Sequence, residues 1–75
     1  MAFETIQRVF NSSGTRVDRT VIVNTNGGQV TIEASYDGAK WVLTDTVAIN
    51  GGYVVYQGAS KLRLTPTGGA EYEFI

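Results

Sequence analysis

Apolar and polar residues alternate along much of this chain, most regularly between Gln29 and Tyr36. The apolar positions there are Val30, Ile32, Ala34 and Tyr36, and the polar positions between them are Thr31, Glu33 and Ser35. A period of two is typical of a β-strand with one buried face. The segment is therefore predicted to be a strand that turns its apolar set toward a core.

Turn signals lie on both sides of this strand. Asp37-Gly38 has the composition of a two-residue hairpin turn, so residues 40–46 are predicted to return antiparallel, with Trp41 and Leu43 on one face. Upstream, residues 17–24 are rich in β-branched side chains and end at Asn26-Gly27-Gly28. This strand is predicted to pair with residues 29–36 through the glycine loop, which gives a meander of three strands.

Similar short runs follow to the end of the chain. Residues 47–49 extend the sheet, residues 53–56 form a strand after Asn50-Gly51-Gly52, and Leu62 and Leu64 alternate with polar residues up to the turn Pro66-Thr67-Gly68-Gly69. Tyr72 and Phe74 alternate with glutamates in a last strand. The predicted fold class is all-β, a small antiparallel β-sandwich or partly open barrel built from hairpins.

The N-terminal segment is ambiguous. Phe3, Ile6 and Phe10 have helical spacing, whereas Thr5, Val9 and Phe10 favour a strand, and we predict a strand or an extended arm. Asn11-Ser12-Ser13-Gly14 is predicted to be a loop or hinge. The chain is thus divided into residues 1–14, a strand or arm with its hinge, and residues 15–75, the β-domain.

Length and composition restrict the function. A chain of 75 residues has a small core, and domains of this size are often stabilised by disulfides, metals or self-association. The sequence contains no cysteine and no histidine, which removes disulfides, the thiolate nucleophile, and the commonest metal ligand and general base. We expect a non-enzymatic protein without a cofactor, which forms a dimer or trimer or docks on a larger body.

Charge and hydropathy narrow the choice of partners. The formal net charge of -1 offers no field that would attract nucleic acid or an anionic membrane. The N-terminal residues carry Glu4 and lack the apolar core of a signal peptide, and no stretch has membrane-spanning length. We therefore expect a soluble protein made in a cytoplasm, with neither nucleic acid nor membrane as partner.

Motifs for metal or phosphate binding are weak. The carboxylates near turns are Asp37, Asp45, Glu71 and Glu73, and they lack the spacing of a calcium-binding loop. The glycine pairs are not followed by lysine and a helix, as a phosphate-binding loop requires. These residues are interpreted as solvated strand faces and turns.

Aromatic and apolar residues supply the candidate contact sites. Trp41 and Tyr72 are expected to fill the core, whereas Tyr53 and Tyr56 lie on opposite faces of one strand and are candidates for contact with a partner or a sugar. The N-terminal candidates for partner contact are Phe3, Ile6, Val9 and Phe10. An ordinary first strand that packs on its own sheet is the alternative interpretation of the N-terminal set.

The run ASYDGAKWVLTDTVAINGGYVVYQGASKLRLTPTGG combines turn, tryptophan and strand residues in a definite order. A strand ends at Ser35 with Asp37-Gly38, Trp41 opens the next strand, and Leu62-Arg63-Leu64-Thr65 leads to Thr67-Gly68-Gly69. This arrangement resembles small β-rich virion proteins of tailed bacteriophages, such as head decoration proteins and fibre or tail modules. The resemblance covers about the C-terminal two thirds of the chain, and the N-terminal third departs from it.

The resemblance implies a structural role on a virus particle, self-association, and no enzymatic activity. The expected function is that of a capsid decoration, or cement, protein that binds coat subunits on the phage head. The alternatives are a receptor- or glycan-binding tip module of a fibre, and a neck or tail adaptor. The expected location is the virion, after synthesis in the host cytoplasm, and the expected partners are further copies of the chain and coat or tail proteins.

Overall fold

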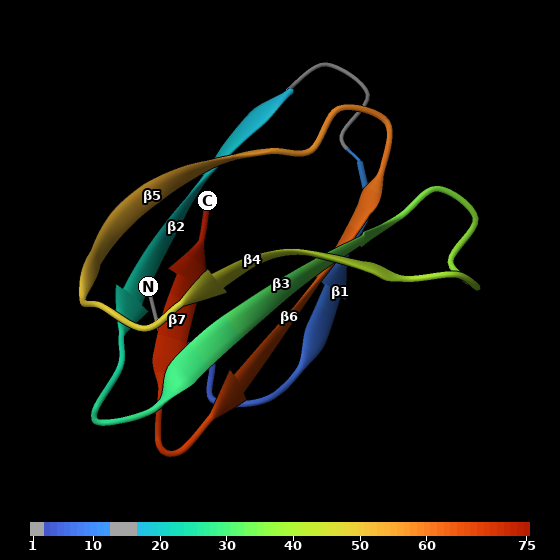
Figure 1. Cartoon of the computed structure of the whole chain (residues 1–75). Coiled ribbons are helices and arrows are strands. Elements are labelled where there is room, and N and C mark those ends of the chain that lie inside the picture. Colours follow the sequence, from blue (N-terminus) through green and yellow to red (C-terminus); the bar gives the residue numbers. More distant parts are fainter. Residues whose placement is uncertain (1–2, 13–16) are drawn as a thin grey trace.

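A computed structural model describes residues 3–12 and 17–75, and these residues form seven β-strands (Figure 1). The strands are β1 (Arg8–Phe10), β2 (Asp18–Asn24), β3 (Gln29–Ser35), β4 (Val42–Val47), β5 (Gly51–Tyr56), β6 (Lys61–Thr67) and β7 (Glu71–Phe74). Each predicted strand has a counterpart among them, with residues 47–49 divided between the end of β4 and the segment that follows it.

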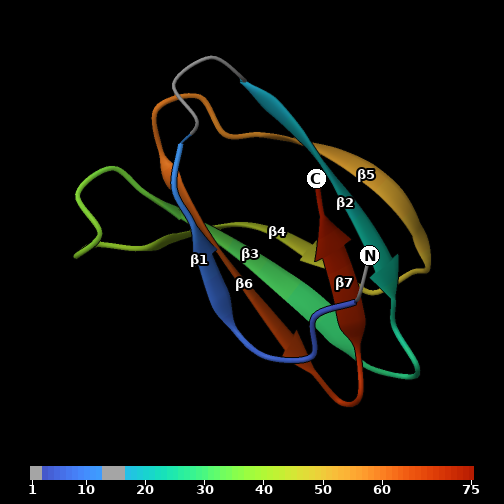
Figure 2. The same ribbon diagram turned by 180° about the vertical axis from the view of Figure 1, so that it is seen from behind.

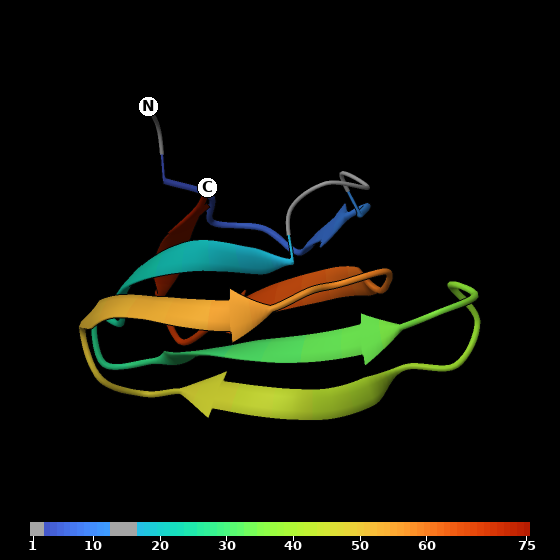
Figure 3. The same cartoon turned by 90° about the horizontal axis from the view of Figure 1, so that it is seen from above.

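The strands form two antiparallel sheets. Sheet A has the order β5-β2-β7 and sheet B has the order β1-β6-β3-β4. Seen from above, β2 and β5 run side by side in one layer and β3 and β4 in the other (Figure 3). The described residues contain no helix and no closed barrel, so the predicted all-β sandwich is confirmed.

The core lies between the two sheets, where both contribute the inward-facing residues of their strands. The buried apolar residues are Val21, Val23, Val30, Ile32, Val47, Val55, Leu62, Leu64, Ala70 and Tyr72. Phe10, Ala34, Tyr53 and Phe74 are partly buried against them. The placement of Tyr72 in the core is therefore confirmed, because its side chain is fully buried.

The predicted pairing of residues 17–24 with residues 29–36 is wrong. β2 pairs with β5 and β7 in sheet A, whereas β3 pairs with β4 and β6 in sheet B. Residues 25–28 therefore carry the chain from one sheet to the other, and residues 68–70 do the same between β6 and β7. A glycine-rich loop fits a hairpin and a crossing between sheets equally well, so the sequence pattern did not distinguish the two.

These two crossings pack backbone against backbone. A Cβ atom added at Gly28 would lie 1.9 Å from the carbonyl oxygen of Thr67, and one added at Gly68 would lie 2.9 Å from the Cα of Gly28. Asn26 also donates a side-chain hydrogen bond to the carbonyl of Gly69, at 3.2 Å. Glycine is thus required here for close approach of two loops, in addition to the turns themselves.

β3 and β4 form the predicted hairpin, but its connection is longer than two residues. The strands are separated by residues 36–41, where Asp37 Oδ1 accepts hydrogen bonds from the backbone N–H groups of Ala39 and Lys40. Gly38 has the expected positive φ, at 82°. The pairing contains a β-bulge at Thr44, whose hydroxyl donates to the carbonyl of Ile32.

The N-terminal segment joins both sheets. β1 pairs with β6 in sheet B, and Glu4 forms an isolated bridge with Tyr72 of β7 in sheet A (Figure 2). Of the two predicted forms, strand and free arm, the structure has the strand. The predicted hinge at Asn11-Ser12-Ser13-Gly14 falls partly on residues 13 and 14, which lie outside the described residues.

Three further predictions need correction. Trp41 is only half-buried because it precedes β4 and lies beside Arg63, outside the core. Tyr36 is 84% exposed because β3 ends one residue before it. Pro66 lies inside β6, where it pairs with Val30, and not in a turn. A proline is accommodated there because β1 pairs with β6 no further than Leu64, so Pro66 lies past the end of β1.

Candidate interaction surface

Large apolar side chains are exposed on two opposite sides of the sandwich. On the first side, which we call the β1 side, they are Phe3, Ile6 and Val9. On the second, the open side, they lie on β4, on β5 and on the segment between them, and they are Val42, Leu43, Ile49, Val54 and Tyr56. The strand orders place β1 and β4 at opposite ends of sheet B, and they place β5 at the end of sheet A away from β7, so the strands that carry the two groups lie at opposite margins.

The β1 side is held closed by contacts between the sheets. Phe10 stacks on Phe74 with ring centroids 4.2 Å apart and meets the ring of Tyr72 edge-on. The hydroxyl of Tyr72 donates to the carbonyl of Ile6, at 3.2 Å. The ring of Phe10 therefore packs inside the sandwich and does not offer a contact to a partner. The side chains of Ile6 and Val9 are about half exposed and are available to a partner.

Among residues 3–12 and 17–75, no ring stacking or side-chain hydrogen bond of this kind joins the sheets on the open side. β4 and β5 are the last strands of their sheets and are connected by residues 48–50. Tyr53 and Tyr56 lie on opposite faces of β5, as their spacing predicts: Tyr53 is half-buried against the core and Tyr56 is 73% exposed. The hydroxyl of Tyr53 donates to the carbonyl of Ile49 at 2.6 Å, which holds the connecting segment against β5.

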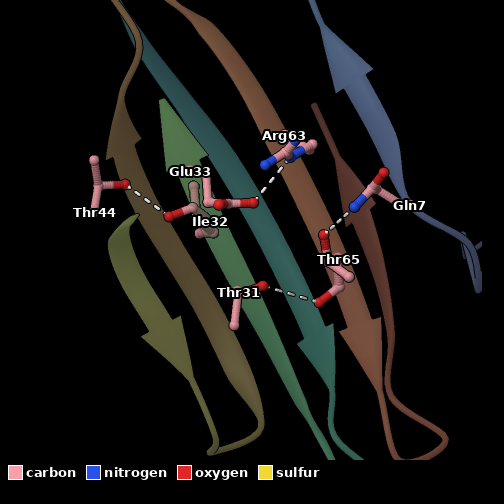
Figure 4. A network of polar contacts seen from close by, with 7 residues as sticks. All are labelled: Gln7, Thr31, Ile32, Glu33, Thr44, Arg63 and Thr65. Carbon is pink, nitrogen blue, oxygen red and sulfur yellow. Dashed lines mark hydrogen bonds and ion pairs between the residues drawn. The ribbon is translucent and has the colours of Figure 1, made fainter. Parts of the chain in front are cut away.

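On the outer face of sheet B, the two central strands β6 and β3 carry polar side chains that are largely paired with one another or with Gln7 (Figure 4). Arg63 and Glu33 form an ion pair at 2.9 Å, and Gln7 donates to the hydroxyl of Thr65 at 2.8 Å. The Arg63 hydrogen bond lowers the pKa of the Glu33 carboxyl below its ordinary value. The Arg63 guanidinium also stacks on the ring of Trp41, at 4.4 Å from its centroid, so one face of that ring is covered by the protein itself.

The residues that sequence reasoning missed belong to the open side. Val42, Leu43, Ile49 and Val54 were not among the predicted contact residues, although all are at least 59% exposed. A signal was present: residues 46–60 contain no charged side chain, although they include the whole edge strand β5 and its connections on both sides. The strand pattern predicted β5, but sequence alone did not show that β5 would be an edge.

Other kinds of site are not formed by the described part of the chain. Within residues 3–12 and 17–75, no group of three aspartate, glutamate, histidine or cysteine side chains is placed to hold a metal ion. Asp37, the carboxylate nearest a turn, is engaged by its own loop, and the hydrogen bonds from Ala39, Lys40 and Ser35 lower its pKa. None of the described segments is a helix with the length and apolarity needed to cross a membrane.

Comparison with known proteins adds no relative. No protein-family model matches the sequence, and neither the curated proteins nor the solved structures include one that is similar to it. The candidate site therefore rests on the geometry of the β1 side and the open side.

Proposed function

We propose that this chain is a non-enzymatic structural protein of a tailed-phage virion, and most specifically a capsid decoration protein that binds coat subunits on the head. The resemblance to virion proteins supports the location on a virus particle. The exposed apolar surface of the sandwich supports a role in binding two neighbouring subunits. The observation that carries the proposal is the presence of exposed apolar side chains on two opposite sides of one small domain.

A cement protein has to contact at least two neighbours. A single apolar patch would serve one interface, whereas the β1 side and the open side lie at opposite margins of the sandwich and can each bury a neighbour's surface. Burial between many copies also stabilises a domain whose own core consists of few large side chains. We assign the β1 side, with Ile6 and Val9, to the coat.

Copy number tests the proposal most directly. A decoration protein approaches the number of coat subunits on purified virions, as measured by quantitative mass spectrometry. A neck or tail adaptor is present at a small fraction of that number, and absence from particles would refute a virion role altogether.

Point variants test the assignment of the β1 side. The double variant Ile6→Ser, Val9→Thr keeps the backbone carbonyl that Tyr72 binds, and it should lower occupancy on undecorated heads about tenfold or more, if each apolar contact contributes roughly 1 kcal/mol. Tyr36→Ser, in the exposed β3–β4 connection, is the matched control and should bind as the parent does. Equal occupancy for both variants would show that the coat contact lies elsewhere.

A glycan-binding fibre tip is the second candidate function, supported by the 73% exposure of Tyr56. Stacking on a sugar requires a free aromatic face, which Tyr56 offers and which Trp41 offers on one side. Titration with a glycan panel should then give a saturable change in tyrosine or tryptophan fluorescence that Tyr56→Ser abolishes. A flat response across the panel would reject this function.

A further inference from the structure

Each sheet ends in two edge strands, and three of the four edges are blunted. β1 is three residues long and contains Arg8. β4 is bent by the bulge at Thr44 and carries Asp45 opposite Ile32, on its core-facing side. β7 carries two glutamates, and its outer edge is covered by Glu4, which exchanges backbone hydrogen bonds with Tyr72. Short edges, bulges, inward charges and covered edges all prevent another strand from adding.

β5 has none of these devices. It is six residues long, reads GGYVVY, and pairs with β2 in an unbroken register from Gly51 to Tyr56. It contains no charge, no proline and no bulge, and Figure 1 shows it along the outer margin of its sheet with no other described strand beyond it. An edge of this kind is a template for pairing with another strand.

The direction of the β5 backbone groups follows from the ladder. Gln57 donates its N–H to the carbonyl of Val17, and Thr20 exchanges hydrogen bonds with Ile75, so odd-numbered residues of β2 bond toward β5 and even-numbered ones toward β7. Because antiparallel ladders alternate, Val55 and Tyr53 bond to β2. The N–H and C=O groups of Gly52, Val54 and Tyr56 therefore point out from the free edge.

These three residues are complementary to themselves. If a second copy pairs antiparallel with Val54 opposite its own equivalent on a two-fold axis, Tyr56 lies opposite the partner's Gly52, and the partner's Tyr56 lies opposite Gly52. An aromatic ring beside a cross-strand glycine is a favourable pair in antiparallel sheets. There is room for it, since a Cβ atom added at Gly52 would have no neighbour within 4 Å.

The unequal sheets give a second reason for strand addition. Sheet B has four strands and sheet A has three. The sheets are joined at the margin formed by β1 and β7, which is the margin away from β4 and β5. Val42 on β4 pairs with Ala34, which packs on the core, yet Val42 is 65% exposed, whereas Val47 at the other end of β4 is buried. A strand added beyond β5 would widen sheet A at its margin on the side of β4.

We propose that the β5 edge binds a second copy of this chain as an isologous, antiparallel β5–β5 dimer centred on Val54, with a continuous six-stranded sheet across the two-fold axis. Three hydrogen-bonded residue pairs form the junction: Val54 with Val54, and Gly52 with Tyr56 in both directions. The inference rests on the isolated chain and not on the proposed virion function, so either can fail without the other.

Cross-linking through a new cysteine tests the register, because the sequence has no cysteine of its own. Residues of a hydrogen-bonded antiparallel pair have Cα atoms about 5.5 Å apart, within the range that a disulfide spans. Val54→Cys should therefore form a disulfide-linked dimer on mild oxidation at about 10 µM protein, a concentration at which a weak dimer is populated. Leu43→Cys, 59% exposed on β4, is the matched control and should remain monomeric on a non-reducing gel.

Sedimentation velocity gives the second measurement. The parent should sediment as a dimer at about 100 µM, and Val54→Lys, which places like charges opposite each other on the two-fold axis, should sediment as a folded monomer with an unchanged circular dichroism spectrum. Leu43→Lys should remain a dimer. A parent that is monomeric or trimeric, or equal cross-linking of both cysteine variants, would overturn the proposal.

Discussion

The side-chain amide of Gln57 donates a hydrogen bond to the backbone carbonyl of Phe10, at 2.9 Å. The same nitrogen donates to the carbonyl of Ser60 at 3.1 Å, and the amide oxygen accepts from Arg19 at 2.8 Å. Gln57 is 1% exposed, so one buried side chain ties the end of β1 to β2 and to the turn before β6. This polar contact links the two sheets where apolar packing would leave backbone carbonyls without donors.

Gln57→Leu should therefore be strongly destabilising although it is nearly isosteric. The leucine leaves the partly buried carbonyls of Phe10 and Ser60 without this donor, which costs about 1–3 kcal/mol in the free energy of unfolding. Urea denaturation of the variant and the parent measures this difference. Gln29→Leu, on the exposed first residue of β3, is the control and should change stability by less than about 0.5 kcal/mol.

Two adjacent glycines should respond differently to alanine. Gly28→Ala forces a Cβ onto the Thr67 carbonyl oxygen, and we expect about 3 kcal/mol or more of destabilisation, or failure to fold, because backbone on both sides must move. Gly27 has a φ of 86°, but a Cβ atom added there would have open space around it. Gly27→Ala should therefore lower the free energy of unfolding by roughly 1–2 kcal/mol through backbone strain alone. Thermal melts of both variants decide the matter; equal losses would mean that the loops do not pack as described.

The alternation of side chains was sufficient to predict the strands, because a period of two reflects local burial. It identified the apolar face of β3 and the opposite faces of Tyr53 and Tyr56 correctly. It did not predict the sheet to which each strand belongs, since Asn26-Gly27-Gly28 is as suitable for crossing between sheets as for a hairpin. Which strands pair is decided by packing between residues far apart in the chain, and a short stretch of sequence does not contain that information.

The contact surface was predictable in part for the same reason. Ile6 and Val9 could be selected from sequence because they lie outside the predicted meander, and they are exposed. Val42 and Val54 could not, because their exposure depends on which face of each sheet is covered and on where β4 and β5 lie within the sheets. Trp41 shows the converse: its size favoured the core, but Arg63 holds it on the outer face of sheet B.

Gly38→Val should weaken the β3–β4 hairpin without shifting its register. Gly38 has φ at 82°, where a β-branched residue is strained, and a cost of about 1–3 kcal/mol is expected in chemical denaturation. Residues 36–41 leave enough chain for the pairing of Val30 with Val47 to be retained. Ala39→Val is the control at an exposed neighbour, and amide exchange in β3 as slow as that of the parent would confirm an unchanged register.

Tyr72 should make the fold sensitive to alkaline pH. Burial raises the pKa of its hydroxyl from the ordinary 10.0 to about 12. Between these values the unfolded chain has released the proton that the folded chain retains. The contribution of the neutral Tyr72 hydroxyl to the free energy of unfolding is therefore complete below pH 10 and decreases as the pH rises toward 12. A shift of this size corresponds to a loss of about 2–3 kcal/mol over that window.

Tyr72→Phe separates this titration from general alkaline unfolding. The variant loses the hydrogen bond to the Ile6 carbonyl, so it should be less stable than the parent at pH 7 by about 1 kcal/mol. It has no buried hydroxyl to ionise, and its stability should therefore change less than that of the parent between pH 9 and about 11.5. Tyr36→Phe, at an 84% exposed tyrosine, is the control and should retain the parent's alkaline slope. An identical slope for Tyr72→Phe and the parent would show that a group other than Tyr72 limits the stability of the sandwich in alkali.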